Sequence, residues 1–193
     1  HGNIPYLFQW NQSNHRLLAS NPSFRDFAKA LWDFLERVYD DKIPHHYFSN
    51  GDFARASSMR LANISKSNGA RLASGLATAG IVKLESYNEL LKLVRKVPSS
   101  STSHGSILSF LLNFDPYMIA SEVPVYSEEL KVTGHIDLLR LAPSNVIEVL
   151  DFKPSLRDVN LLLAMPQVAM YGVLLNKLIP STKDRVLCTL FNT

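Results

Sequence analysis

Cysteine is nearly absent from this chain. Cys188 is the single cysteine among 193 residues. One cysteine cannot form an internal disulfide, and alone it cannot hold a zinc ion or an iron–sulfur cluster. The sequence therefore excludes a fold stabilised by internal disulfides and a metal centre built on cysteines.

Long apolar runs are missing as well. No run approaches the roughly 18 apolar residues needed to cross a bilayer, and the N-terminal residues lack the basic-then-apolar layout of a secretory signal. The composition, 46% hydrophobic and 19% charged, is that of an ordinary globular protein. We therefore expect an intracellular protein, cytoplasmic or nucleoid-associated, without a membrane partner. Its length allows one sizeable core or two small ones.

The chain also lacks a large net charge, which is only +3, but the charges are unevenly distributed. Residues 1–97 contain 13 lysines and arginines against 8 acidic residues, whereas residues 98–193 contain 7 against 9. A basic half could face a phosphate backbone while an acidic half carries a metal site. The alternative is a chance difference between two surfaces.

One segment combines the pattern of a buried strand with two charged residues. Residues 146–153 are rich in β-branched and apolar side chains and precede Pro154, as expected for a short central strand. Side chains alternate between the two faces of a strand, so Asp151 and Lys153 share one face. Burying both charges is unfavourable unless they are paired or bind a metal ion, which favours a functional role.

A second strand is predicted at residues 131–141, with a turn at 142–145 that would make an antiparallel hairpin. In this hairpin Asp137 can lie beside Asp151. Two carboxylates and a bound phosphate make an oxygen-rich site suited to Mg²⁺ or Mn²⁺, which can activate water for phosphodiester cleavage. Lys153 would then hold or polarise the water and offset charge on the phosphorus.

A third motif follows on a predicted helix, where Gln167 and Tyr171 are four residues apart and so share one face. The ordered motifs Gly134-His135-Ile136-Asp137, Asp151-Phe152-Lys153 and Gln167-Val168-Ala169-Met170-Tyr171 resemble the PD-(D/E)XK nuclease superfamily, specifically its RecB-like branch. That branch has a Gly-x-x-Asp strand, an Asp/Glu-x-Lys strand and a helix with Gln-x-x-x-Tyr. The resemblance covers roughly residues 104–193.

The resemblance implies an α/β (α+β) fold, with a restriction-endonuclease-like αβββαβ core around a mixed central sheet and a helical N-terminal region before it. We assign the core to residues 99–193 and the helical region to residues 1–98, with the boundary in a serine-rich run. The implied activity is hydrolysis of DNA by an Mg²⁺- or Mn²⁺-dependent deoxyribonuclease in DNA repair, recombination or processing.

The resemblance also implies roles for single residues. Asp137, Asp151 and the backbone carbonyl of Phe152 would bind the metal ion. Gln167 and Tyr171 would support the active-site strand and approach the DNA. The alternative for the last two is an amphipathic helix that happens to contain both residues.

The chain departs from the RecB-like pattern in two ways. It lacks the four cysteines that hold an iron–sulfur cluster in some relatives. Relatives often have Gly-x-x-x-His on the first core helix, with the histidine among the metal ligands. Counted from Gly105, that position holds Ser109, whereas His104 precedes the glycine. Either His104 binds the metal from the loop, or no histidine does.

Three further polar residues lie on the predicted strands near these motifs. Glu122, on a strand expected at residues 119–125, stands where the superfamily often has a carboxylate; it is either a metal ligand or nearby base, or an edge-strand glutamate facing solvent. Glu148 has the opposite strand parity to the Asp-x-Lys pair and is excluded. His135 shares the parity of Asp137 and would contact DNA or metal, or be a hydrogen-bonded structural histidine.

The N-terminal half contains one clear core helix. Asn21 is a suitable N-cap and Pro22 suits the first turn, and the helix should end near Asp40 or Asp41. Its apolar side chains recur at three- and four-residue spacing. They are Phe24, Phe27, Ala28, Leu31, Phe34, Leu35 and Val38.

Residues 55–85 resemble a winged helix-turn-helix, with two helices, a turn at residues 65–68 and a short strand at residues 80–84. The resemblance implies that Arg71 lies near the start of a recognition helix and Lys66 contacts phosphates. The alternative is a helical cap beside the nuclease core. Another helix is expected at residues 87–96, and the chain should close with a helix beginning at Pro166 and a strand at residues 185–191.

Arg157, in the loop after Lys153, is placed to meet a phosphate. The competing functional class is a non-catalytic module, either a DNA-binding module or a degenerate nuclease fold that serves as an assembly subunit. Because the sequence ends directly after the last predicted strand, we expect it to be a fragment.

Overall fold

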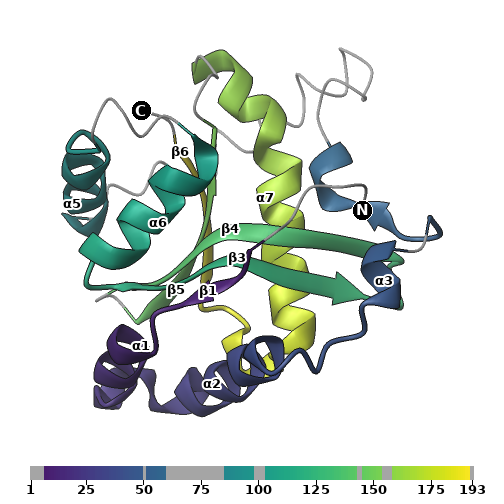
Figure 1. Cartoon of the computed structure of the whole chain (residues 1–193), viewed down its shortest axis with the longest axis horizontal. Coiled ribbons are helices and arrows are strands. Elements are labelled where there is room, and N and C mark those ends of the chain that lie inside the picture. The colour runs from purple at the N-terminus through teal and green to yellow at the C-terminus, as the bar shows by residue number, and fades with distance from the viewer. Residues whose placement is uncertain are drawn as a thin grey trace.

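The strands of the computed structural model lie between helices on both faces (Figure 1). The structure describes residues 7–49, 51–59, 85–97, 103–142, 145–153 and 158–191. Within these ranges it is a mixed α/β structure, as the sequence predicts, with one six-stranded sheet. None of the helices in these ranges is both long and apolar enough to cross a bilayer.

The N-terminal region contributes strands as well as helices. In chain order it contains β1 (Gln9–Trp10), α1 (Gln12–Ala19), the 3-10 helix η1 (Pro22–Phe24), α2 (Arg25–Tyr39), α3 (His46–Ser49), β2 (Ala54–Arg55), the 3-10 helix η2 (Ala56–Ser58) and α5 (Glu85–Val94). The predicted helix is η1 followed by α2, and the whole apolar stripe from Phe24 to Val38 is buried, which confirms the prediction.

The C-terminal region follows the predicted order of elements. It contains α6 (His104–Phe114), β3 (Met118–Ser127), β4 (Val132–Ala142), β5 (Val146–Phe152), α7 (Asp158–Leu178), the 3-10 helix η4 (Pro180–Thr182) and β6 (Val186–Phe191). The predicted antiparallel hairpin is β4 paired with β5. β6 runs parallel to β5, so the sheet is mixed.

The strand order is β1-β3-β4-β5-β6, and β2 pairs in parallel with the start of β4. The two predicted regions therefore share this sheet, because β1 and β2 come from residues 1–98. The predicted boundary at residues 98 and 99 falls outside the described residues.

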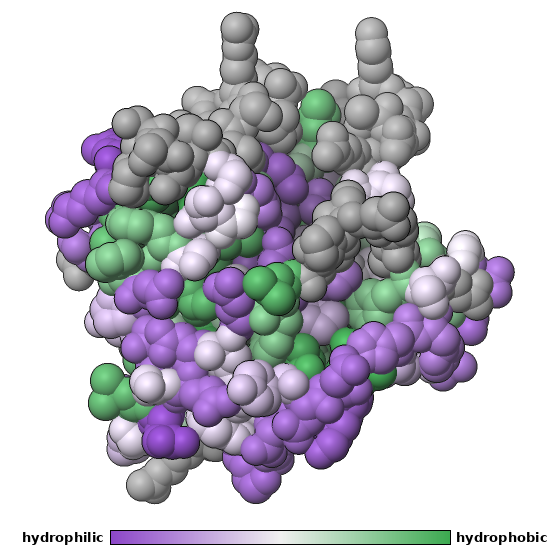
Figure 2. All heavy atoms as spheres, viewed as in Figure 1, coloured by the Kyte–Doolittle hydropathy of each residue, from purple (hydrophilic) through white to green (hydrophobic). Residues whose placement is uncertain are grey.

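Two hydrophobic clusters cover the two faces of the sheet. One joins α2 and α7 to residues of the central strands such as Val123, Leu139 and Val149. The other joins α5 and α6 to Leu138 and Leu150 of the opposite face. Figure 1 shows α5 and α6 together at the upper left and α1 and α2 at the bottom. On the face drawn in Figure 2, hydrophobic and hydrophilic residues are interspersed, with a continuous hydrophilic strip at the lower right.

The helix that carries Gln167 and Tyr171 begins earlier than predicted. Pro166 was expected in its first turn, but α7 begins at Asp158 and Pro166 lies inside it. A proline in a helix interior removes one backbone hydrogen bond and crowds the preceding turn. The burial of Ala164, Val168, Leu174 and Leu175 along α7 offsets this cost, because tertiary packing supplies most of the stability of a helix in a protein.

Candidate active site

The residues predicted to act in catalysis lie where β4 and β5 separate. Residues 138–142 of β4 pair with β5, and residues 132–133 pair with β2. Beyond this point β5 continues through residues 151–152 with β6 as its partner. Among the described residues, no strand pairs with this edge of β4 at residues 134–137. Side chains can therefore reach backbone groups there.

Asp137 occupies this opening. The backbone N–H of Phe152 donates a hydrogen bond of 2.8 Å to Asp137 Oδ2, and the carboxylate is almost fully buried. The last strand pair, Leu138 with Leu150, would place Asp137 opposite Asp151 if the register continued by one residue. A side-chain hydrogen bond thus holds the two strands together at the point where their backbone pairing ends.

Asp151 is fully buried, and the Asp-x-Lys and Gln-x-x-x-Tyr motifs meet at its carboxylate. Gln167 Nε2 donates to Asp151 Oδ1 at 3.1 Å and to the Tyr171 hydroxyl at 2.8 Å. Lys153 Nζ forms an ion pair with Asp151 Oδ2 at 2.7 Å. Strand parity places the lysine beside the aspartate, and the helical spacing places Gln167 and Tyr171 on one side of α7.

Gly134 is required for the close approach of α7 to β4. A Cβ atom at this position would overlap Cε1 of the Tyr171 ring and would lie 3.2 Å from the Cβ of Ala56. Neither neighbour can move easily, because Tyr171 and Ala56 are both buried in the core. The glycine of the Gly-x-x-Asp motif therefore has a packing reason in this chain.

Glu122 and His104 approach Asp137 from the two other elements of the site. His104 Nε2 lies 3.7 Å from Glu122 Oε1 and 3.6 Å from Asp137 Oδ2. His104 is the first residue of α6, after the N-cap Ser103, and not part of a loop. Glu122 has a φ of 52°, which is unusual for a residue other than glycine and is found often at functional sites.

The solvent-facing alternative for Glu122 is wrong. β3 lies between β1 and β4 in the sheet, so it is not an edge strand, and the Glu122 side chain is only 16% exposed. The sequence could not show that β3 is an internal strand, because its outer neighbour β1 is only two residues long.

The electrostatics of the site favour protonated carboxyl groups. Burial, and then repulsion from Asp137, raise the pKa of Glu122 to about 7. The same two causes raise the pKa of Asp151 to about 7, although Lys153 opposes them. The contact with Asp137 raises the pKa of the His104 imidazole, against an opposing effect of burial. The cluster therefore contains more negative charge than its own cations balance.

A divalent cation fits this donor set, although the side chains are not grouped as a ready-made site. In the described ranges, no three histidine, cysteine, aspartate or glutamate side chains are gathered so that they could hold a metal ion as they stand. Two carboxylate oxygens nevertheless have no hydrogen-bond donor in the described part of the chain, namely Glu122 Oε2 and, apart from its ion pair, Asp151 Oδ2. Buried oxygens of this kind are the ligands that Mg²⁺ and Mn²⁺ prefer.

Other predicted residues lie away from this cluster or outside the described residues. Glu148 forms a buried ion pair with Arg140 at 2.7 Å, as expected from its opposite parity. The half-buried ring of His135 packs against Phe48 with 5.2 Å between ring centres, and burial lowers its pKa to about 4. The predicted DNA contacts Lys66, Arg71 and Arg157 lie outside the described residues.

The sequence did not reveal the role of the Phe152 N–H. A metal-binding role for the Phe152 carbonyl oxygen stays a prediction, and the structure shows in addition that the Phe152 amide donates to Asp137. No pattern in the sequence could show this bond, because it depends on where two strands stop pairing.

No protein-family model, no curated protein and no solved structure matches this chain.

Proposed function

We propose that this chain is a metal-dependent deoxyribonuclease of the PD-(D/E)XK type and its RecB-like branch. One observation carries the proposal. The carboxylate of Asp151, buried at the end of a central strand, is held between Lys153 and Gln167 and is repelled by Asp137. A structural ion pair does not require further acids beside it, because added negative charge destabilises it.

The order of elements supports the same class. The run α6-β3-β4-β5-α7-β6 has the αβββαβ order expected of a restriction-endonuclease-like core. We propose that α6 to β6 form this core, with the active site at the separation of β4 and β5.

The metal ligands would be Asp137, Asp151, Glu122 and His104, with the carbonyl oxygen of Phe152. Bound Mg²⁺ or Mn²⁺ would supply Lewis acidity and lower the pKa of a coordinated water. Binding would also replace the proton that Glu122 and Asp151 retain near neutral pH.

The remaining residues position the reacting groups. Lys153, whose side chain is 16% exposed, can hold a water or a phosphate oxygen while it stays paired with Asp151. Gln167 fixes the orientation of the Asp151 carboxylate and is itself placed by Tyr171. These contacts restrict the side-chain rotamers, and such pre-organisation is what a phosphodiester hydrolase needs. We propose that Lys66, Arg71 and Arg157 contact the DNA backbone.

A second candidate is a non-catalytic module, either a DNA-binding module or a degenerate nuclease fold acting as an assembly subunit. It is favoured by the absence, among the described residues, of a ready-made group of three metal-binding side chains. The two candidates differ in whether a divalent ion binds at Asp137.

A cleavage assay tests the proposal. The protein is incubated with linear, circular and single-stranded DNA, with and without Mg²⁺, and the products are separated on a gel. Asp151→Ala should abolish metal-dependent cleavage without unfolding the protein, whereas Asp33→Ala, an exposed aspartate on α2, should cleave normally. Cleavage retained by Asp151→Ala would sink the assignment. Cleavage of circular DNA indicates an endonuclease, and cleavage of linear DNA alone indicates an exonuclease.

Calorimetry separates the two candidates if no cleavage is found. A nuclease should bind Mn²⁺ stoichiometrically, and this binding should be lost in Asp137→Ala. A non-catalytic module should show no such binding.

A further inference from the structure

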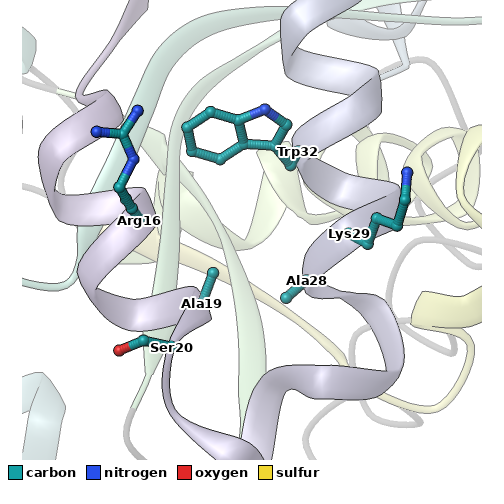
Figure 3. A pocket seen from close by; sticks show the side chains of 6 residues that line it. All are labelled: Arg16, Ala19, Ser20, Ala28, Lys29 and Trp32. Carbon is teal, nitrogen blue, oxygen red and sulfur yellow. The ribbon is translucent and has the colours of Figure 1, made fainter.

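A cleft between α1 and α2 has no role in the proposed nuclease chemistry. Its volume is about 450 Å³, within the range of about 300–1,000 Å³ that is usual for ligand sites. It is lined by Arg16, Ala19 and Ser20 from α1 and by Ala28, Lys29 and Trp32 from α2. Figure 3 shows the Trp32 ring reaching across the gap toward Arg16, with Ala19 and Ala28 below it.

The charge of the cleft is positive. Arg16 is exposed, and its guanidinium lies 5.7 Å from the centre of the Trp32 ring. No carboxylate within the described residues forms an ion pair with it. Lys29 Nζ pairs with Asp33 at 2.6 Å, but both side chains are exposed, and such surface pairs are weak. Arg16 is therefore available to an anion, and Lys29 can turn toward one.

Trp32, which forms the aromatic wall of the cleft, packs against two further ring side chains. Trp32 contacts Trp10 at 4.6 Å and the buried ring of His15 at 5.0 Å between ring centres. Trp10 Nε1 donates to His15 Nδ1 at 3.1 Å, and burial lowers the pKa of His15 to about 4. His15 is therefore neutral, and its proton is on Nε2, which has no acceptor among the described residues. A buried donor without an acceptor is uncommon, and this one adjoins the wall of the cleft.

The floor of the cleft is suited to a flat group. Ala19 and Ala28 have the smallest side chains that carry a Cβ atom, so they leave open space beside the indole. The Ser20 hydroxyl donates to the backbone carbonyl of Leu17 at 2.6 Å, which leaves its oxygen free to accept a hydrogen bond from a ligand. A planar ring with N–H groups and an attached anion is complementary to this arrangement.

We propose that the cleft binds a nucleoside phosphate, with the base against Trp32 and the phosphate at Arg16. Lys29 adds charge at the rim. The ligand is either a free nucleotide or one nucleotide of a single strand, because both present the same ring and phosphate. Aromatic side chains bind bases without sequence preference, and guanidinium groups bind phosphate in a bidentate manner. The proposal does not depend on the proposed function, because no metal ion and no cleavage are involved.

The test is a binding titration of the full chain in the presence of EDTA, which prevents metal-dependent cleavage. A fluorescein-labelled oligothymidylate is titrated by anisotropy, and unlabelled dTMP is used as the competitor. Arg16→Gln removes the cation from an exposed position, and Ala19→Leu fills the cleft without changing charge. Each should weaken binding by about tenfold or more. Arg37→Gln, an equal charge change at an exposed site of α2 outside the cleft, should alter binding by less than about twofold.

Competition by dTMP indicates that the cleft accepts a free nucleotide. Binding of the oligonucleotide without competition indicates a site for a nucleotide within a strand, and both results support the proposal. Three results would overturn the proposal. The protein could bind neither the oligonucleotide nor dTMP, Arg16→Gln and Arg37→Gln could weaken oligonucleotide binding equally, or Ala19→Leu could bind the oligonucleotide as tightly as the wild type does. Thermal unfolding of each variant verifies that it is folded. Loss of cleavage in Asp151→Ala leaves these predictions unchanged, so failure of either proposal can be recognised separately.

Discussion

Burial of the Asp151 carboxyl group makes the contribution of this residue to stability depend on pH. Its carboxyl group is fully buried, and its pKa is raised from 3.8 to about 7 by burial and by Asp137. The folded protein therefore holds this proton more tightly than the unfolded chain does. The stability that results is present below about pH 4 and is lost as the pH rises from about 4 to about 7.

Replacing Asp151 with asparagine should therefore stabilise the metal-free protein at high pH. The amide oxygen can still accept the hydrogen bond from Gln167, no carboxylate charge has to be buried at this position, and Lys153, whose side chain is 16% exposed, can turn its ammonium toward solvent. We expect the free energy of unfolding at pH 8 to increase by about 1–3 kcal/mol, and to change little at pH 4. Urea unfolding in EDTA at both pH values measures this difference, with Asp33→Asn as the exposed control. Equal loss of stability at both pH values would contradict the prediction.

The sequence correctly predicts the helices and strands whose positions follow from a local residue pattern alone. The stripe from Phe24 to Val38 predicted α2, and two apolar strand patterns separated by a turn predicted the antiparallel hairpin of β4 and β5. The sequence did not predict the features that depend on contacts between residues far apart in the chain. The start of α7 before Pro166 depends on packing against the sheet, and the bond between Asp137 and the Phe152 N–H depends on the end of strand pairing.

Strand parity also separates two acidic groups that lie close together in the sequence. Glu148 points to the opposite face from Asp151, where Arg140 donates to Glu148 Oε2 at 2.7 Å and to Asp115 Oδ2 at 2.8 Å. All three charged groups are buried, and the Arg140 guanidinium also lies 5.1 Å from the centre of the Tyr117 ring. This cluster connects β4 and β5 to the end of α6.

Glu148→Ala should therefore lower the stability of the protein but leave the proposed DNA cleavage unchanged. Removing one partner leaves Arg140 incompletely compensated in the core, which costs about 3 kcal/mol or more. We expect urea unfolding to show this loss, with a smaller loss for Glu148→Gln, which keeps a hydrogen-bond acceptor. Cleavage per folded molecule should remain as in the wild type. A loss of cleavage without a loss of stability would place Glu148 in the active site and would refute the parity argument.

The N-terminal helix α2 forms part of the hydrophobic core on one face of the sheet. Leu31 and Leu35 of α2 are fully buried in the same cluster as Val123 and Val149 of the strands. Exposing such a face to water costs about 25 cal/mol for each Å² of apolar surface. The sequence did not predict this arrangement, because an amphipathic helix does not reveal which sheet it will cover.

Residues 99–193 should therefore not fold alone. We expect the isolated segment to lack a cooperative thermal transition and dispersed amide resonances, whereas the full chain should unfold in one transition. Leu31→Ala in the full chain should lower the free energy of unfolding by about 2–5 kcal/mol without changing that single transition. Calorimetry and amide NMR spectra measure both effects. A folded, cooperative segment 99–193 would show that α2 is not part of its core.

The hydrogen bond from Phe152 to Asp137 has a spectroscopic consequence. The chemical shift of an amide proton depends strongly on the charge of its acceptor, and Asp137 Oδ2 is the acceptor here. Any proton or cation that joins this carboxylate will therefore shift the Phe152 resonance, with or without substrate. The Phe152 amide resonance therefore reports the protonation or cation binding of Asp137 from a backbone atom, in any variant that keeps this aspartate.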